Sequence, residues 1–204
     1  MSNLERALRD SAPPGDAGAA AIAARRLAAR AAQEGAADVA YALVPSPLGA
    51  LAGVCSRRGL LCISYRAEHL DELLEGLAAA VSPRIVESPA RLDAVARQLD
   101  EYFAGRRRRF ELPIDWSLSR GFARRVLRAT TRVPYGTATT YTEVAGRAGS
   151  PLAVRAAGNA LAANPVPIVV PCHRVLRVGG GLGGYAGGLE RKRFLLELEG
   201  ALEG

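Results

Sequence analysis

Three prolines fall within seven residues of one apolar segment, residues 164–175. Proline lacks the backbone N–H that a helix or a central strand needs, and it biases the residue before it toward extended geometry. The first two prolines therefore end the helical pattern before them, and we expect a short buried strand over residues 168–170. Directly after it stand Cys172 and His173. The most constrained part of the chain thus ends in a thiol next to an imidazole.

This pairing is typical of a nucleophilic cysteine. A free thiol has a pKa of about 8.5 and is mostly protonated at neutral pH. A nearby base or positive charge supplies the reactive thiolate, and we expect His173 to accept the proton while Arg174 adds positive charge. A lone cysteine is more often a small buried hydrophobe, which is our interpretation of Cys55 and Cys62 in apolar runs.

Length and cysteine content limit the class of protein. The 204 residues suffice for one large domain or two small ones. No apolar run approaches the roughly 18–20 residues that span a bilayer, and the first residues lack the pattern of a secretory signal. Three cysteines without a pairing pattern do not indicate a disulfide scaffold. We therefore expect a cytoplasmic protein with no membrane partner.

The charge balance favours a polyanionic partner. Lysine and arginine together number 27 against 20 acidic residues, which gives a formal net charge of +7. Basic side chains bind phosphates and release counterions, so the excess is consistent with nucleic-acid binding. A genome of high GC content explains the arginine bias equally well, since the single lysine is Lys192.

The first half of the chain predicts an α/β unit. Residues 1–37 are rich in Ala and Arg and form an N-terminal extension that we expect to be helical or poorly anchored. Short apolar runs separated by turn residues then predict an antiparallel meander of three strands over 41–44, 50–55 and 60–65. Helical spacing follows over 70–80 and 89–103, and a basic connector, 105–116, leads to the second half.

The second half predicts a helix-turn-helix. A helix begins near Ser119, and Thr140 with Glu143 has the spacing of a capping box that opens a short helix. We expect Ser150 to cap the next helix and Pro151 to occupy its first position. That helix carries small residues and one long basic side chain, Arg155, so it can approach another surface closely.

A glycine-rich segment, residues 179–188, follows the reactive cysteine. It lacks the Lys-Ser/Thr ending of a phosphate-binding loop, and we interpret it as a wall around a flat ligand with one aromatic residue, Tyr185. The last helix is expected over 189–199. Glu199 lies near its end, where the helix dipole disfavours a carboxylate, and a histidine partner would explain its position.

The segment 164–175, Asn-Pro-Val-Pro-Ile-Val-Val-Pro-Cys-His-Arg-Val, closely resembles the active-site segment of the O6-alkylguanine-DNA alkyltransferases, also called methylated-DNA–protein-cysteine methyltransferases. The resemblance continues through Val133-Pro134-Tyr135-Gly136-Thr137, Tyr141, Arg155, the Gly183–Leu189 run and Leu195–Gly200. It is strong over residues 119–200 and looser over 40–116.

The resemblance implies an α+β fold in two parts. An N-terminal α/β domain, 38–116, is expected to be ribonuclease-H-like with a small antiparallel sheet. A C-terminal winged helix-turn-helix domain, 117–204, is expected to bind DNA and accept the alkyl group. Residues 1–37 lie outside the resemblance.

The resemblance also implies roles for individual residues. Cys172 is the alkyl acceptor, and His173 and Glu199 form a proton relay with it. Asn164 hydrogen-bonds near the thiol. Tyr141 assists extrusion of the base and helps protonate the guanine leaving group.

Two further sets of residues are expected around this centre. The DNA contacts are Arg155, which takes the place of the flipped base, with Tyr141, Arg174, Ala156 and Gly158. The residues expected to form the substrate pocket are Val175, Tyr185, Ala186 and Gly187. Relatives carry Ser or Ala at the position of Ala186.

The implied activity is single-turnover repair of O6-alkylguanine in double-stranded DNA by a monomer, without metal or cofactor; O4-alkylthymine stays open as a second substrate. The alternatives are a non-reactive lesion-binding or regulatory helix-turn-helix protein and a cysteine hydrolase. A metal site from Cys55, Cys62 and His69 has the wrong spacing for close ligand pairs.

Overall fold

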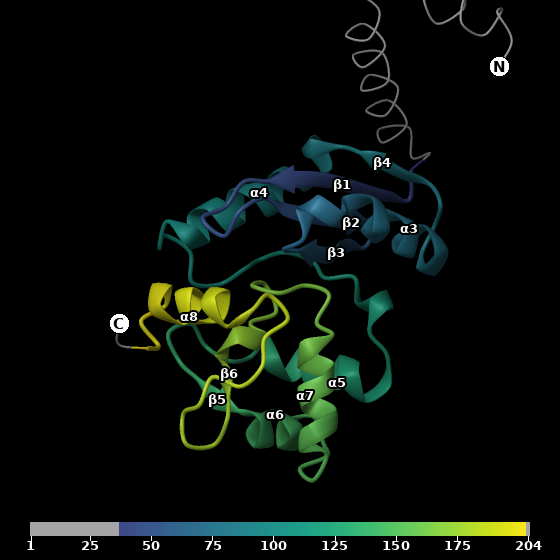
Figure 1. Ribbon diagram of the computed structural model, residues 1–204. Coiled ribbons are helices and arrows are strands. Elements are labelled where there is room, and N and C mark those ends of the chain that lie inside the picture. The colour runs from purple at the N-terminus through teal and green to yellow at the C-terminus, as the bar shows by residue number, and fades with distance from the viewer. Residues whose placement is uncertain (1–36, 203–204) are drawn as a thin grey trace, which may run out of the picture.

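The computed structural model describes residues 37–202. These residues form two units that lie one above the other in Figure 1, with the sheet in the upper unit and most of the later helices in the lower one. The extension expected over residues 1–37 lies outside the described residues except for Ala37, which is buried. None of the helices described between residues 37 and 202 is long and apolar enough to cross a membrane.

The upper unit contains a four-stranded sheet in the order β3-β2-β1-β4. The strands are β1 (Val39–Val44), β2 (Leu51–Ser56), β3 (Gly59–Ser64) and β4 (Ile85–Glu87). The first three pair antiparallel, as the meander predicted. The fourth pairs parallel to β1. It was not predicted, because three residues are too few to show a strand period.

Two helices cover opposite faces of this sheet. The helices α3 (Leu70–Ala80) and α4 (Pro89–Phe103) have the predicted bounds. Consecutive residues of β1 pack against different helices. Val39 shares a hydrophobic cluster with Leu77 of α3, while Ala40 shares one with Leu92 of α4. A short 3-10 turn, η1 (Ala67–His69), precedes α3, and another, η2 (Trp116–Leu118), ends the connector.

The lower unit is built on four helices and a pair of very short parallel strands. The helices are α5 (Gly121–Thr130), α6 (Tyr141–Arg147), α7 (Val154–Ala162) and α8 (Leu189–Leu198); the strands are β5 (Thr139–Thr140) and β6 (Val175–Leu176). Helix α5 packs against both α6 and α7. The predicted capping box is present, because Thr140 Oγ1 accepts from Glu143 N at 3.2 Å and Glu143 Oε2 accepts from Thr140 N at 2.9 Å.

Two local predictions in this unit were wrong. Helix α7 begins at Val154, not at Pro151, because Ser150 closes a separate turn in which its carbonyl accepts from Ala153 N. Residues 168–170 are buried but do not form a strand. Val170 N donates to Val166 O at 2.9 Å, and Ile168 has a φ of 72°. Val169 N donates to Pro167 O at 2.9 Å, so the amides of this segment are used in local turns and not in a strand ladder.

The two units share one hydrophobic core. It contains buried residues of β1, β2 and α4 together with residues of α5, α6 and α7. Backbone hydrogen bonds also join the units: Ile63 N in β3 donates to Pro165 O at 2.8 Å. The segment before Cys172 is therefore held by the sheet of the upper unit.

Candidate active site

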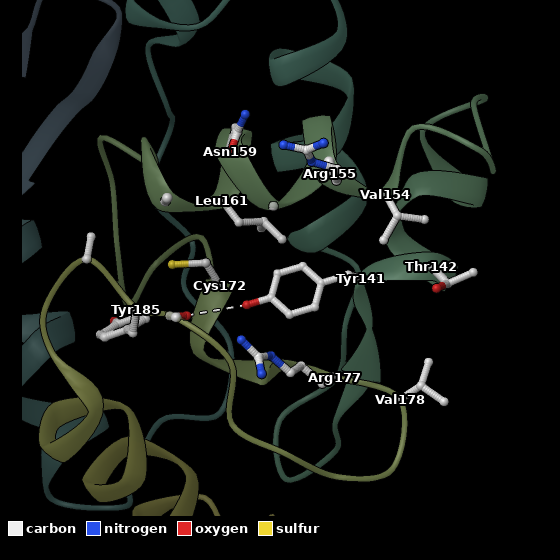
Figure 2. Close-up of a pocket in the computed structure, with 14 residues that line it drawn as sticks. Tyr141, Thr142, Val154, Arg155, Asn159, Leu161, Cys172, Arg177, Val178 and Tyr185 are labelled. Atoms are coloured by element: carbon white, nitrogen blue, oxygen red, sulfur yellow. Dashed lines mark hydrogen bonds between the residues drawn. The ribbon is translucent and has the colours of Figure 1, made fainter.

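A cavity of about 600 Å³ opens beside α6, α7 and the glycine-rich loop. Figure 2 shows the ring of Tyr141 across the middle of this pocket, with Arg155 and Asn159 on the helix above it. Cys172 and Tyr185 lie together at one side. The complete lining is Tyr141, Thr142, Val154, Arg155, Gly158, Asn159, Leu161, Ala162, Cys172, Arg177, Val178, Gly184, Tyr185 and Ala186.

Cys172 begins the 3-10 turn η3 (Cys172–Arg174) and is buried at 5% exposure. Its Sγ accepts a hydrogen bond from Asn164 Nδ2 at 3.1 Å. The same amide is held on both sides, because Nδ2 also donates to Val170 O at 2.9 Å and Oδ1 accepts from Val166 N at 3.0 Å. Asn164 thus directs an N–H donor at the sulfur.

The thiol is not strongly acidic in its resting state. Burial raises the pKa of Cys172, while the hydrogen bond from Asn164 and the positive charge of Lys192 act in the opposite direction. A buried thiol of this kind needs a base to take its proton before it can react.

His173 and Glu199 are the adjoining acid–base pair. Both side chains are fully buried, and His173 Nε2 lies 2.9 Å from Glu199 Oε1. Burial lowers the pKa of His173 against the opposing effect of the carboxylate, so the ring is neutral at neutral pH. An ionised Glu199 can only accept, and Nε2 must therefore carry the proton. Nδ1 is then a base, and it has no hydrogen-bond partner among residues 37–202.

Arg174 fixes Glu199 from the other side. Its Nε donates to Oε2 at 2.8 Å and its Nη2 donates to Oε1 at 2.9 Å, while Nη1 donates to Val133 O at 2.6 Å. Burial alone would raise the pKa of Glu199, but hydrogen bonds from His173 and Arg174 hold it at about 2. Arg174 is buried at 6% exposure. Its guanidinium is engaged inside the protein, and the expected contact with DNA stays a prediction.

Tyr141 and Tyr185 form the aromatic part of the pocket. Tyr141 is the first residue of α6, directly after the capping box, and its hydroxyl donates to Gly184 O at 3.3 Å. Burial raises the pKa of Tyr141, so its phenol is a neutral donor. The Tyr185 hydroxyl lies 2.6 Å from that of Tyr65, at the end of β3.

The other predicted residues divide into two groups. Arg155, Ala156 and Gly158 lie on α7; Arg155 is exposed at the pocket, and Gly158 approaches the Tyr141 ring. Ala186 also lines the pocket. Val175 and Gly187 do not line it: Val175 is fully buried, and Gly187 is covered by Tyr65.

Sequence reasoning missed several residues around the thiol. Lys192 is fully buried, and its Nζ donates to Val175 O at 2.6 Å and to Leu182 O. Its burial lowers the pKa of the ammonium to about 8. As the one lysine in an arginine-rich chain, Lys192 was a detectable signal. Arg177 and Asn159 also border the pocket and carried no motif.

Within residues 37–202, no three His, Cys, Asp or Glu side chains are grouped so that they could hold a metal ion. The site brings together one thiol, one imidazole–carboxylate pair and two phenols beside a helix-turn-helix. This combination defines a DNA-binding protein with a nucleophilic cysteine.

Comparison with known proteins identifies the family. A profile described as "6-O-methylguanine DNA methyltransferase, DNA binding domain" matches residues 121–201. A second, for the ribonuclease-like domain of the same proteins, matches residues 39–116. The chain belongs to this family of methylated-DNA–protein-cysteine methyltransferases, and the resemblance and the α+β fold expected from the sequence are confirmed.

Individual relatives agree. The inducible methylated-DNA–protein-cysteine methyltransferase of Bacillus subtilis is 36% identical over 70% of this chain and 79% of its own. The Methanosarcina barkeri protein is 36% identical over 78% of this chain and 96% of its own. The crystal structure of Mycobacterium tuberculosis OGT in complex with DNA covers 79% of this chain and 93% of its own, with 35% identity and a TM-score of 0.66.

Proposed function

We propose that this chain repairs duplex DNA by moving the alkyl group of O6-alkylguanine onto Cys172, once per protein molecule. Direct reversal of DNA alkylation follows from family membership. The observation that carries the assignment to this residue is the Cys172 thiol, hydrogen-bonded by Asn164 at the wall of a pocket that α7 borders.

Access to the thiol requires that the base leave the duplex. The O6 substituent of a stacked guanine is enclosed by the DNA helix. Flipping the base out of the duplex costs roughly a few kcal/mol. Small residues on α7, such as Gly158, permit close approach of the helix to DNA. The exposed Arg155 at the pocket is placed to occupy the space that the base leaves.

The first proton transfer activates sulfur. Nδ1 of His173 takes the thiol proton through a hydrogen-bonded path, and Glu199 stabilises the imidazolium that forms. The thiolate then attacks the alkyl carbon in line with the C–O6 bond. The S–C bond forms as the C–O bond breaks, and the electron pair remains on the guanine.

The guanine anion requires one proton, which balances the one lost by the thiol. Tyr141, a neutral phenol in the pocket, is the donor that we assign, and the imidazolium returns the proton to this network. The transfer needs no oxidant or reductant. Since the product is a stable thioether, each protein molecule reacts once.

The decisive experiment uses a duplex with one O6-[methyl-labelled]guanine. We expect label to pass to protein in a one-to-one ratio and mass spectrometry to place one methyl group on Cys172. Cys172→Ala should bind the duplex and gain no mass. If the wild-type protein binds the lesion without gaining mass, it is a non-reactive binder; repeated turnover of an ester would indicate a hydrolase.

The other cysteines are internal controls for this experiment. Burial raises the pKa of Cys55 to about 11 and that of Cys62 to about 12. Neither should gain a methyl group from the duplex. Label on either residue would contradict the assignment to Cys172.

We also propose that the monomer is the active species and that the chain divides into domains at 38–116 and 117–204. The hydrogen-bonded pairs Asn164–Cys172 and His173–Glu199 both form within a single chain. Sedimentation of the unliganded protein and of its complex with a short duplex tests the first proposal. Limited proteolysis near residues 116–117 tests the second.

A further inference from the structure

One residue of the N-terminal unit reaches the centre of the reactive site. Tyr102, in the last turn of α4, is fully buried, and its hydroxyl donates to Glu199 Oε1 at 2.6 Å. That oxygen also lies 2.9 Å from His173 Nε2. A tyrosine from the ribonuclease-like unit and the imidazole of the DNA-binding unit thus share one carboxylate oxygen.

The ring of Tyr102 is held in place by other aromatic residues. The centroid of Phe110 lies 5.2 Å from it, that of Phe103 lies 5.4 Å away, and that of Tyr135 lies 6.2 Å away. A ring enclosed in this way cannot turn its hydroxyl elsewhere without moving the core. The hydroxyl is therefore a fixed donor directed at Glu199.

Tyr102 acts on Glu199 as a neutral group. Burial and then the adjacent carboxylate raise the pKa of Tyr102 far above its ordinary value. The phenol keeps its proton over the whole range in which His173 titrates. It always donates, and it withdraws electron density from Oε1 at every pH of interest.

We propose that Tyr102 is a positioning residue of the alkyl transfer: it holds Glu199 so that the carboxylate keeps the proton of His173 on Nε2 and leaves Nδ1 free to accept the thiol proton. This inference rests on the proposed function. It also gives the N-terminal unit a direct part in the chemistry.

The geometry of Glu199 explains why this hydroxyl matters. Arg174 binds both carboxylate oxygens and fixes the plane of the group. Gly136 N lies 3.4 Å from Oε2, so it is a long contact on the side away from Oε1. Tyr102 is the neutral donor on Oε1, where it limits the negative charge that His173 meets.

Loss of the hydroxyl should therefore change the titration of His173. With one donor fewer, Oε1 attracts the imidazolium more strongly, and the pKa of His173 rises. The groups that face this pair are Tyr102 of α4, Tyr135, Arg174 of η3 and Lys192 of α8. Of these, Tyr102 is the one whose hydrogen bond to Glu199 can be removed with little change of shape and no change of charge.

The test compares Tyr102→Phe with Tyr135→Phe. Both substitutions remove one hydroxyl from the same aromatic cluster, but the Tyr135 hydroxyl donates to Leu198 O and not to the carboxylate. We expect Tyr102→Phe to lower the rate of methyl transfer from duplex by about tenfold, the size of one hydrogen bond to a charged group. The acidic limb of its pH–rate profile should move to higher pH. The affinity for duplex DNA should stay unchanged.

A second measurement does not depend on transfer. The chain has two histidines, and in a His69→Gln background the ring nitrogens of His173 can be followed alone by 15N NMR. We expect the Nε2–H tautomer in the wild-type protein, and in Tyr102→Phe the same tautomer with a raised His173 pKa. Thermal melts of both Phe variants report any general loss of packing.

The inference is overturned if Tyr102→Phe keeps the wild-type pH–rate limb and the wild-type ring shifts. It is also overturned if Tyr135→Phe moves the limb by the same amount, since the effect would then be loss of packing. If the wild-type protein transfers no methyl group, the proposed function fails, and the NMR comparison still decides the role of Tyr102.

Discussion

Glu199 is a buried carboxylate whose charge is retained only because its neighbours are cationic or donate hydrogen bonds. Its folded-state pKa of about 2 lies below the ordinary value of 4.5. A depressed carboxyl pKa contributes stability above the ordinary value, and this contribution is lost as pH falls toward the folded value. A shift of this size corresponds to about 3 kcal/mol.

We therefore predict that Glu199→Gln lowers the free energy of unfolding by about 3 kcal/mol or more at pH 7, because it also leaves Arg174 buried without its partner. The difference from wild type should shrink as pH falls from about 4.5 toward about 2, where half of the wild-type carboxyl groups are protonated in the folded state. Urea unfolding of both proteins at pH 7 and at pH 3 gives the difference in free energy of unfolding at each pH.

Glu197→Gln is the matched control, since Glu197 is an exposed carboxylate two residues away. It should unfold like wild type at both pH values. If Glu199→Gln shows a pH-independent loss, the ionised carboxylate is not the source of the stability. The same variant should raise the pKa of Cys172 in pH-dependent alkylation, and an unchanged value would remove Glu199 from the relay.

Arg155 is a second residue whose role can be tested by one substitution. Its expected role concerns DNA and not the thiol. Because it is exposed at the pocket and makes no contribution to the pair His173–Glu199, we predict that Arg155→Ala lowers repair of duplex by about tenfold or more, the cost expected from lost compensation for flipping. Reaction with free O6-benzylguanine should change by less than about twofold, since no base is flipped. Single-turnover rates on both substrates give the comparison.

Arg193→Ala removes the same charge from an exposed position on α8 that does not line the pocket. It controls for the loss of net charge. Equal losses on duplex and free base in Arg155→Ala would exclude a role in replacing the base.

At the residue scale, the reacting residues were easier to predict from the sequence than the residues that surround them. Cys172, His173 and Asn164 are adjacent in one short segment, and their motif brings them to notice together. Tyr102 comes from 70 residues before Cys172 and carries no motif. The helical spacing over 89–103 does not single out Tyr102, whereas the structure buries it fully and buries Phe103 partly. A buried tyrosine requires a partner, but only the fold says which one.

At the scale of elements, the loop between β6 and α8 controls the pocket by its backbone. Gly183 has a φ of 67°, and a Cβ there would lie 2.8 Å from the Tyr141 hydroxyl. Gly180 has a φ of 86°, and a Cβ there would meet nothing within 4 Å. The two glycines share a left-handed backbone but differ in what they approach.

We predict that Gly183→Ala and Gly180→Ala each cost about 1 kcal/mol of stability from backbone strain. Only Gly183→Ala should also slow methyl transfer, because the new methyl group displaces the Tyr141 hydroxyl from the pocket. Thermal melts and single-turnover rates separate the two effects. Equal slowing by both variants would mean that loop strain, and not contact with Tyr141, limits the reaction.

Elements with strong local signals were predictable. The bounds of α3 and α4 and the capping box of α6 followed from helical spacing and from Thr140 with Glu143. The errors fall where local signals compete. Ser150 is a residue type that often caps helices, yet here it forms a separate turn with Ala153. Strand β4 is fixed only by its pairing with β1.

At the scale of the whole molecule, the N-terminal unit supplies two hydroxyls to the site of the other unit. Tyr102 contacts Glu199, and Tyr65 contacts Tyr185 at 2.6 Å. Neither pairing follows from the sequence, because the partners are far apart along the chain. Tyr102 and Glu199 are 97 positions apart, and Tyr65 and Tyr185 are 120 positions apart. The resemblance predicted two units, and their shared core explains why the second one does not form the site alone.

The Tyr65 contact leads to a prediction about the shape of the pocket. The Arg191 guanidinium lies over the Tyr65 ring, 5.2 Å from its centroid, so the ring is held while its hydroxyl meets Tyr185. Tyr65→Phe should free the Tyr185 ring and slow reaction with benzylguanine several-fold, because a bulky flat substrate depends on an ordered aromatic wall. Methyl transfer should fall less.

Tyr41→Phe is the matched control, because Tyr41 lies on β1 and packs against the other cluster, on the α3 side of the sheet. This substitution removes one tyrosine hydroxyl from the same unit, at a position outside the pocket. The ratio of benzyl to methyl transfer rates should fall in Tyr65→Phe and stay constant in Tyr41→Phe. A constant ratio in both variants would mean that the sheet stabilises the protein without shaping its substrate pocket.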